Sequence, residues 1–131
     1  MCIRDREGEG HVLRLSQKEF WLIGHDVDRA DLNHKALAMG SCYPLFCQDS
    51  HCWFMLTGDH KSDVMAKLCG VDLRNSAFPE GSIAQTSIAR LNGLVIHHCV
   101  GKMQVYSILS DSASAQYLWE AIDDALSEFS P

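Results

Sequence analysis

The sequence predicts an α+β fold, a two-layer sandwich in which helices pack on one face of an antiparallel sheet. Strand-like apolar runs come in groups that short turns join, which is typical of antiparallel pairing. Helical patterns separate these groups, and no long alternation of strand and helix appears, which argues against a parallel sheet. The chain ends in a strongly amphipathic pattern, which predicts a helix with one face buried on a neighbouring layer.

Composition places the chain among globular proteins and narrows its partners. Its 131 residues suffice for one domain, and 47 % apolar against 21 % charged residues exclude a disordered chain. The net charge of −6, with scattered Lys and Arg, argues against binding to phosphate backbones. No apolar run reaches the about 18–20 residues that a membrane helix needs. We therefore expect neither a nucleic acid nor a membrane as partner.

The first six residues have an unusual character. Met1-Cys2-Ile3-Arg4-Asp5-Arg6 reads like the in-frame translation of a common sequencing-library adapter, so residues 1–6 are excluded from the expected fold. The natural chain is then expected to begin near Glu7, with an N-terminal part missing, and residues 7–131 to form a single domain. The alternative is a genuine, poorly ordered N-terminus.

The cysteines predict a reducing compartment. Five remain when Cys2 is set aside: Cys42, Cys47, Cys52, Cys69 and Cys99. An odd number, without a secretory signal, predicts reduced thiols in a cytoplasmic protein. The first three have four residues between neighbours, but the sequence contains no C-x-x-C pair. His51 or His60 would complete a metal site only with an assumed loop geometry, so we expect core thiols and no bound metal.

The first half of the chain predicts two strands and a helix. Residues 12–23 contain two apolar runs around a polar centre, Ser16 to Glu19, which predicts a strand pair. Asp28 can cap a helix that Met39-Gly40 ends, with a narrow apolar stripe between them. Residues 43–46 are apolar but contain Pro44, which allows an edge strand or an extended segment at best.

Residues 51–56 predict a strand that is apolar on both faces. Cys52, Phe54 and Leu56 fall on one face, and His51, Trp53 and Met55 on the other. Two interpretations remain open. The strand is central and covered twice, or its second face meets a partner.

A helix and a turn follow. The helix is expected to begin at Asp59, to run to Leu68 with Val64 and Met65 inward, and to stop at Cys69-Gly70. Residues 78–81 then fit a type I turn, with Pro second and Gly fourth. Phe78 is expected to anchor this loop to the core.

The clearest hairpin joins residues 83–91 to residues 94–98. Asn92-Gly93 between them tolerates the positive φ that a type I′ turn requires. A second turn at Val100-Gly101 leads to a strand over residues 103–109. The last helix is expected to be capped by Asp111 or Ser112. Its expected inward side chains are Ala115, Leu118, Trp119, Ile122, Leu126 and Phe129.

Few residues invite a chemical role. Arg90 follows small polar residues, among them Gln85 and Thr86, and could bind a carboxylate or an acidic residue of a partner. The alternative is an ordinary exposed Arg near a turn. His97 and His98 point to opposite faces of a strand, so we expect one partly buried, hydrogen-bonded histidine and one exposed histidine.

No catalytic motif is present. The sequence contains no G-x-G-x-x-G, no Walker-type loop and no G-x-S-x-G. His51 beside Cys52 cannot act as a base and nucleophile pair, because strand neighbours point to opposite faces. We therefore expect no catalytic, cofactor-binding or metal-binding residue in this chain.

The stretch from Cys69 to Leu91 carries a family resemblance. C-x-V-D-L, then F-P-x-G, then A-Q-T-S-x-A-R-L and a hairpin resemble the gamma subunit of heterotetrameric sarcosine oxidase. Residues 111–119, 20–22 and 48–50 fit the same family. The motif residues are expected to set the backbone path: Cys69, Asp72, Leu73, Phe78, Pro79, Gly81, Asn92 and Gly93.

The resemblance implies a place in a bacterial oxidase. That complex oxidises sarcosine with oxygen to glycine and hydrogen peroxide, and passes the one-carbon unit to tetrahydrofolate or releases formaldehyde. The family's other subunits hold FAD, FMN, NAD, tetrahydrofolate and zinc. The gamma subunit is similar in fold to folate-dependent aminomethyltransferase domains, and no catalytic residue transfers to this sequence. Its implied role is to pack against the alpha and beta subunits.

Three hypotheses therefore remain. The chain is a non-catalytic subunit of the oxidase, or an independent folate or one-carbon-binding domain in which Arg90 holds a carboxylate. The third and weakest is a thiol or metal protein.

Overall fold

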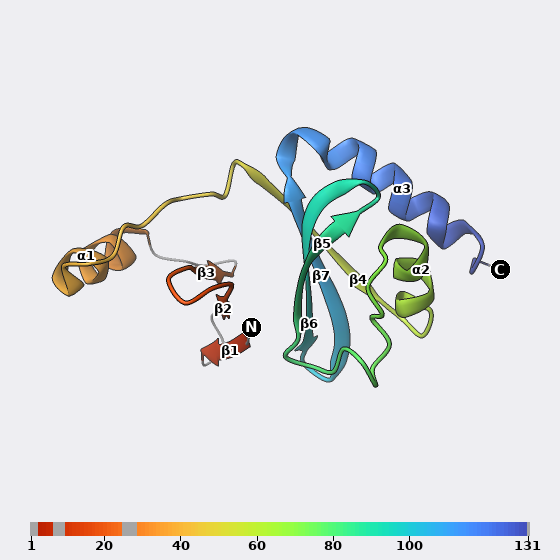
Figure 1. Ribbon diagram of the computed structural model, residues 1–131, viewed down its shortest axis with the longest axis horizontal. Helices are drawn as coiled ribbons and strands as arrows, with labels where there is room; N and C mark the ends of the chain where they lie inside the picture. The colour runs from red at the N-terminus through yellow and green to blue at the C-terminus, as the bar shows by residue number, and fades with distance from the viewer. Residues whose placement is uncertain (1–2, 7–9, 25–28, 131) are drawn as a thin grey trace. The chain divides into compact units, whose positions relative to one another are not determined.

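The computed structural model describes residues 3–6, 10–24 and 29–130, and divides the chain into two compact units (Figure 1). The first unit is Met1–Gln48 and the second is Asp49–Pro131. That residues 7–131 make one domain stays a prediction. No helix in the described ranges is long and apolar enough to cross a membrane.

The first unit contains a small antiparallel sheet. Its strands are β1 (Ile3–Arg6), β2 (Gly10–Arg14) and β3 (Phe20–Ile23), in the order β1-β2-β3. The strand pair expected within residues 12–23 is confirmed as β2 and β3. Ser16 closes their turn, because its Oγ accepts hydrogen bonds from the backbone N–H groups of Lys18 at 3.2 Å and Glu19 at 3.0 Å. Residues 3–6 pair with β2, and their origin in an adapter stays a prediction.

The predicted first helix is confirmed as α1 (Arg29–Met39). It ends as expected, because Gly40 adopts a φ of +71°, which favours glycine. The expected cap, Asp28, lies outside the described residues. Residues 43–46 form no strand and are exposed, which leaves the extended segment of the two options.

The second unit contains a four-stranded antiparallel sheet in the order β4-β7-β6-β5. In chain order its elements are β4 (His51–Thr57), α2 (Lys61–Leu68), β5 (Ile83–Ile88), β6 (Leu91–Val100), β7 (Met103–Asp111), a short 3-10 turn (Ser112–Ser114) and α3 (Ala115–Ser127). The predicted strand at residues 51–56 is confirmed, but β4 is an edge strand and not a central one. The first interpretation of its two apolar faces is therefore wrong.

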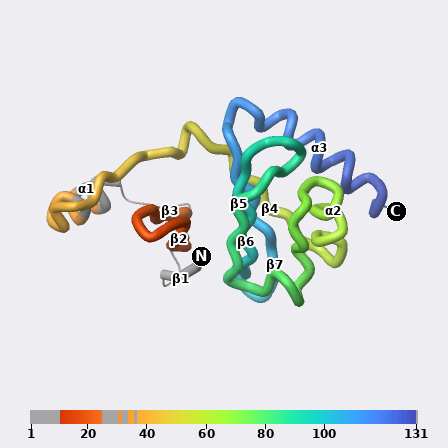
Figure 2. Tube along the Cα trace, in the orientation of Figure 1, coloured from red at the N-terminus to blue at the C-terminus, as the bar shows by residue number. Residues whose placement is uncertain are grey.

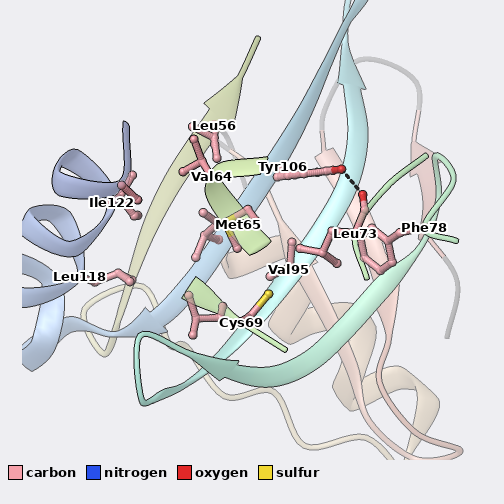
Figure 3. Packing of buried hydrophobic residues seen from close by; sticks show 13 residues of the cluster. Leu56, Val64, Met65, Cys69, Leu73, Phe78, Val95, Tyr106, Leu118 and Ile122 are labelled. Carbon is pink, nitrogen blue, oxygen red and sulfur yellow. Dashed lines mark hydrogen bonds between the residues drawn. The ribbon is translucent and has the colours of Figure 1, made fainter. Parts of the chain in front are cut away.

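Helices α2 and α3 cover one face of this sheet, as the predicted sandwich requires (Figure 1). Val64 and Met65 of α2 and Leu118 and Ile122 of α3 pack toward the sheet (Figure 3). The sheet side of this core comprises Leu56, Ile88, Val95, Tyr106 and Ile108. The α+β fold class is confirmed.

The second face of the same sheet is also apolar. Its buried side chains are Ile83, Leu94, Ile96, Val105 and Leu109. Consecutive residues in β6 and β7 are therefore buried in both directions, which is typical of central strands. Sequence alternation alone cannot reveal this, because apolar residues occupy both faces.

The hairpin turn lies three residues earlier than predicted. Its central residues are Ala89 and Arg90, with φ of 50° and 70°, and Ile88 pairs with Leu91. A turn at Asn92-Gly93 would pair Ala84 with residue 101, beyond the end of β6, whereas Ala84 pairs with Val95. The long β6–β7 pairing therefore overrides the local preference of Asn-Gly.

The loop after α2 also departs from the predicted turn. The N–H of Ser82 donates to the carbonyl of Pro79 at 3.1 Å, so the turn begins at Pro79 and not at Phe78. Gly81 is then the third residue, with a φ of +92°, as a type II turn requires. Phe78 is buried, which confirms it as the anchor of this loop.

The helix limits and one inward position need correction. Helix α2 begins at Lys61 and not at Asp59, because residues 58–60 form the turn before it. Helix α3 begins at Ala115, after the 3-10 turn. Trp119 was expected inward but is 56 % exposed, since Leu118, Ile122 and Ala125 face the sheet and Trp119 lies about 100° around the helix from Leu118.

Candidate functional site

The tip of the β5–β6 hairpin is the first candidate site. Ala89 and Arg90 both adopt left-handed backbone conformations, which cost a non-glycine residue about 1 kcal/mol or more. Two hydrogen bonds hold this tip. The N–H of Ala89 donates to the carbonyl of Leu68 at 2.7 Å, and the hydroxyl of Tyr117 donates to the carbonyl of Ala89 at 2.8 Å. The tip is thus fixed to the end of α2 and the start of α3, which lie beside it in Figure 2.

Arg90 lies in this turn and not in a strand. The sequence suggested a strand position, but Arg90 occupies the turn and its side chain is exposed. A guanidinium on a rigid, solvent-facing tip can bind a carboxylate of another molecule without first paying for backbone ordering. Arg90 is therefore a candidate for contact with an acidic group of another molecule.

Gln85 and Thr86 do not share a face with each other. Gln85 pairs with Leu94 and is exposed, whereas Thr86 pairs with Gly93 and is half-buried. Strand neighbours point to opposite faces, so a single site cannot contain both side chains. Of the three predicted contact residues, Arg90 and Gln85 are exposed and Thr86 is half-buried.

Gly93 has a packing role, and Asn92 precedes it in the same strand. Within β6, Asn92 lies opposite Ser87 and Gly93 lies opposite Thr86. A Cβ on Gly93 would lie 2.6 Å from Cδ1 of Ile88 and 3.2 Å from the carbonyl oxygen of Leu109. Glycine is therefore required for close approach between β6 and its neighbours.

Hydrogen bonds from side chains of the sheet hold the loop over residues 69–81. The hydroxyl of Tyr106 donates to the carbonyl of Leu73, as the dashed line in Figure 3 shows. Nδ1–H of His97 donates to the carbonyl of Phe78 at 2.7 Å, and the two rings stack. The backbone carbonyls of the motif residues Leu73 and Phe78 thus accept hydrogen bonds from buried side chains of the sheet.

Two ionisable groups under this loop are kept neutral. Burial raises the pKa of the Cys69 thiol, although a contact with the carbonyl of Val71 opposes this. Burial also raises the pKa of Tyr106, and the negative charge of Asp72 and, once the thiol ionises, that of Cys69 raise it further. A buried thiol with a raised pKa is a poor nucleophile, so Cys69 fits a structural role.

Asp72 forms an exposed ion pair within the same motif. Its carboxylate accepts hydrogen bonds from Nε of Arg74 at 2.9 Å, from Nη2 at 2.7 Å and from the backbone N–H at 3.1 Å. The side-chain bonds to Arg74 are the main reason that the pKa of Asp72 falls to about 2. Such exposed pairs contribute little stability, so this pair orders the turn locally.

His97 and His98 are both buried, at 1 % and 3 % exposure. The expectation of one exposed histidine is wrong, because the sheet is buried on its second face as well. On that face Oγ of Ser107 forms a hydrogen bond with Nε2 of His98 at 2.6 Å, and it accepts a hydrogen bond from the indole N–H of Trp53 at 2.8 Å. Indole nitrogen is only a donor, which fixes the direction of the Trp53–Ser107 bond.

The hydrogen bonds that link Trp53, Ser107 and His98 were not predicted from the sequence. Their only signal was a lone serine between apolar residues in the run Val105 to Leu109. A serine and a histidine in contact could suggest acyl transfer, but Ser107 is fully buried. No substrate can reach its Oγ in this conformation. These hydrogen bonds therefore provide partners for polar side chains buried on the sheet.

The cysteine and histidine candidates for a metal belong to different parts of the chain. Cys42 and Cys47 are exposed in the first unit, while Cys52 lies on β4 in the second. His60 forms a pair with Asp63 at 3.3 Å and stacks on Phe129. Within the described ranges, no group of three His, Cys, Asp or Glu side chains could hold a metal ion.

A comparison with solved structures supports the predicted fold. Neither a family model nor a curated protein matches the sequence. Among solved structures, heterotetrameric sarcosine oxidase from Corynebacterium sp. U-96 in complex with pyrrole 2-carboxylate contains a similar chain, with a TM-score of 0.81 and 26 % identity. The match covers 98 % of this chain and 65 % of that one. This chain is similar to a sarcosine oxidase subunit. The predicted resemblance is thereby supported at the level of the heterotetrameric oxidase.

Proposed function

We propose that this chain is the gamma-type subunit of a heterotetrameric sarcosine oxidase and carries no catalytic residue of its own. The observation that carries the proposal is the match over 98 % of the chain at a TM-score of 0.81. The motif over residues 69–91 supports the same assignment independently of the fold. Because the chain spans 65 % of the similar one, the activity and partners of the whole assembly belong to this proposal.

In this proposal the chemistry lies in the partners. The alpha and beta subunits and a small zinc subunit would hold FAD, FMN, NAD, tetrahydrofolate and zinc. They would oxidise sarcosine with oxygen in the cytoplasm. The described side chains support such a division, because the Ser107–His98 pair is buried and burial raises the pKa of the Cys69 thiol.

Arg90 is the proposed contact with an acidic residue of a partner subunit. Its exposure and the anchored backbone beneath it support this role. A rim arginine that forms a charged hydrogen bond contributes enough to change affinity measurably.

Co-expression with the alpha and beta subunits tests the proposal. We expect the tagged chain to retain both subunits through affinity purification and gel filtration. Arg90→Ala should weaken the association by about tenfold, the loss of one charged hydrogen bond. Lys102→Ala is the matched control, because it removes an exposed cation from the other hairpin turn of the sheet and should leave the affinity unchanged. A wild-type chain that purifies alone contradicts the proposal.

The exposed guanidinium of Arg90 also supports a second candidate function, binding of a folate carboxylate by the isolated chain. Calorimetry with tetrahydrofolate separates the two candidates. Heat that Arg90→Ala abolishes would favour folate binding, and an absence of heat rejects it.

A further inference from the structure

An exposed apolar segment follows the first sheet. Every residue from 37 to 50 is exposed, and five of them are large and apolar. Their exposed fractions are 70 % for Leu37, 69 % for Met39, 92 % for Tyr43, 85 % for Leu45 and 48 % for Phe46. Large apolar side chains gathered in this way mark a surface that another molecule covers. We call residues 37–48 the apolar arm; Figure 2 shows its part after α1 as an extended stretch.

Helix α1 contains the start of the arm and exposes the side chains that the structure describes on it. It has 11 residues, and each of its described side chains, at positions 31, 34, 35 and 37–39, is exposed. A helix of this length is marginal in water unless one face is packed. The ion pair between Asp31 and Lys35, at 2.6 Å, adds only about 0.2–0.5 kcal/mol. A docked partner would pack against the exposed side chains at the end of this helix.

The composition of the arm limits what that partner can be. Residues 40–48 contain no Asp, Glu, Lys, Arg or His. A membrane surface is disfavoured, because interfacial segments attach through basic residues beside their apolar ones. Pro44 lacks an N–H group, so the segment cannot pair as an uninterrupted strand with a sheet edge. Side chains, rather than the backbone ladder, must carry the recognition.

We propose that the apolar arm docks into an uncharged, apolar groove on a different subunit of the assembly, with Tyr43, Leu45 and Phe46 as its anchors. This inference rests on the proposed function and names the segment that makes the contact. A different subunit is favoured over a second copy because the similar chain belongs to a heterotetramer. Aromatic anchors in apolar pockets carry most of the energy in such interfaces.

The test compares two multiple variants of the full chain, co-expressed with the alpha and beta subunits. Tyr43→Ser, Leu45→Ser and Phe46→Ser together remove the anchors and should weaken association about 100-fold or more. Val100→Ser with Met103→Ser is the control, because it removes exposed apolar side chains, 46 % and 49 % exposed, from the second unit. The control should bind within about threefold of the wild type.

Hydrogen exchange supplies a second readout. Backbone amides of residues 41–48 should exchange quickly in the free chain and at least tenfold more slowly in the complex, a change of about 1.4 kcal/mol in opening free energy. The exchange of β6 and β7 should be the same in the triple variant and the wild type. If it is not, Leu45→Ser alone replaces the triple variant and should still weaken association about tenfold.

The outcomes separate this inference from the proposed function. A wild-type chain that fails to associate rejects both. Equal association of wild type and arm variant, or unchanged exchange of residues 41–48 in the complex, rejects the docking arm alone. An isolated chain that is dimeric by light scattering, and becomes monomeric in the triple variant, assigns the arm to a second copy and likewise overturns the proposal.

Discussion

The hydroxyl of Tyr117 donates a 2.8 Å hydrogen bond to the backbone carbonyl of Ala89, which joins the start of α3 to the hairpin tip. Ala89 has a φ of 50°, so this bond stabilises a strained residue. We expect Tyr117→Phe to lower the free energy of unfolding by about 0.5–1.5 kcal/mol. Urea denaturation measures this value. Tyr43→Phe is the control, because Tyr43 is 92 % exposed and its change should fall within about 0.5 kcal/mol. Equal effects of the two substitutions would contradict the anchoring role.

Arg90 combines an unfavourable backbone conformation with a free side chain. Its φ is 70°, and glycine adopts that angle without a Cβ clash. Arg90→Gly should therefore raise the free energy of unfolding by about 1 kcal/mol. Thermal and urea denaturation of the isolated chain measure the gain. The same substitution should weaken subunit association, whereas Arg90→Lys keeps a charge at the same backbone strain. A loss of stability in Arg90→Gly would mean that the side chain itself supports the fold.

Gly93 and Ile88 form a tight pair across the β5–β6 hairpin. A methyl group on Gly93 would meet Cδ1 of Ile88 at 2.6 Å. Gly93→Ala should cost about 1–3 kcal/mol, the range for overpacked positions. Ile88→Val removes that Cδ1, so the double variant should be more stable than the sum of the single losses predicts. The contact with the carbonyl oxygen of Leu109 at 3.2 Å remains, so rescue is partial. Strict additivity in urea denaturation would show that the two side chains do not collide.

Tyr106 predicts a loss of stability at alkaline pH. Burial raises its pKa, so the folded chain keeps the phenolic proton at a pH where the unfolded chain releases it, above about 10. The folded state binds more protons in that range, so this contribution is fully present below about pH 10 and falls as the pH rises. Urea midpoints measured at neutral and alkaline pH should show the decline.

Tyr106→Phe supplies the control for this titration. It should lower stability at neutral pH by about 1–3 kcal/mol, because the carbonyl of Leu73 loses its donor. It should also flatten the alkaline decline without abolishing it, because burial raises the pKa of Cys69 in the same direction. An unchanged slope in Tyr106→Phe would assign the decline to other groups.

Local patterns predicted the elements well where the helix or strand period was clear. The final helix, the strand at residues 51–56 and the anchor Phe78 follow directly from apolar spacing and turn residues. Asn92-Gly93 misled the hairpin prediction, because a dipeptide preference is worth less than the register of a whole strand. For the candidate site, sequence selected Arg90 by its charge, but could not place it on a tip held by Leu68 and Tyr117.

The sequence by itself determined the fold class, the antiparallel strand groups and the motif that points to an oxidase subunit. These properties depend on residue type and short-range spacing, which can be read directly from the sequence. Only the tertiary structure decided the turn at Ala89-Arg90, the burial of both His97 and His98, and the edge position of β4. The turn and the edge position depend on strand pairing between residues far apart in sequence, and the free energy of that pairing exceeds the local preference of Asn-Gly. The burial of the two histidines depends on the covering of both faces of the sheet, which residue type and short-range spacing do not contain.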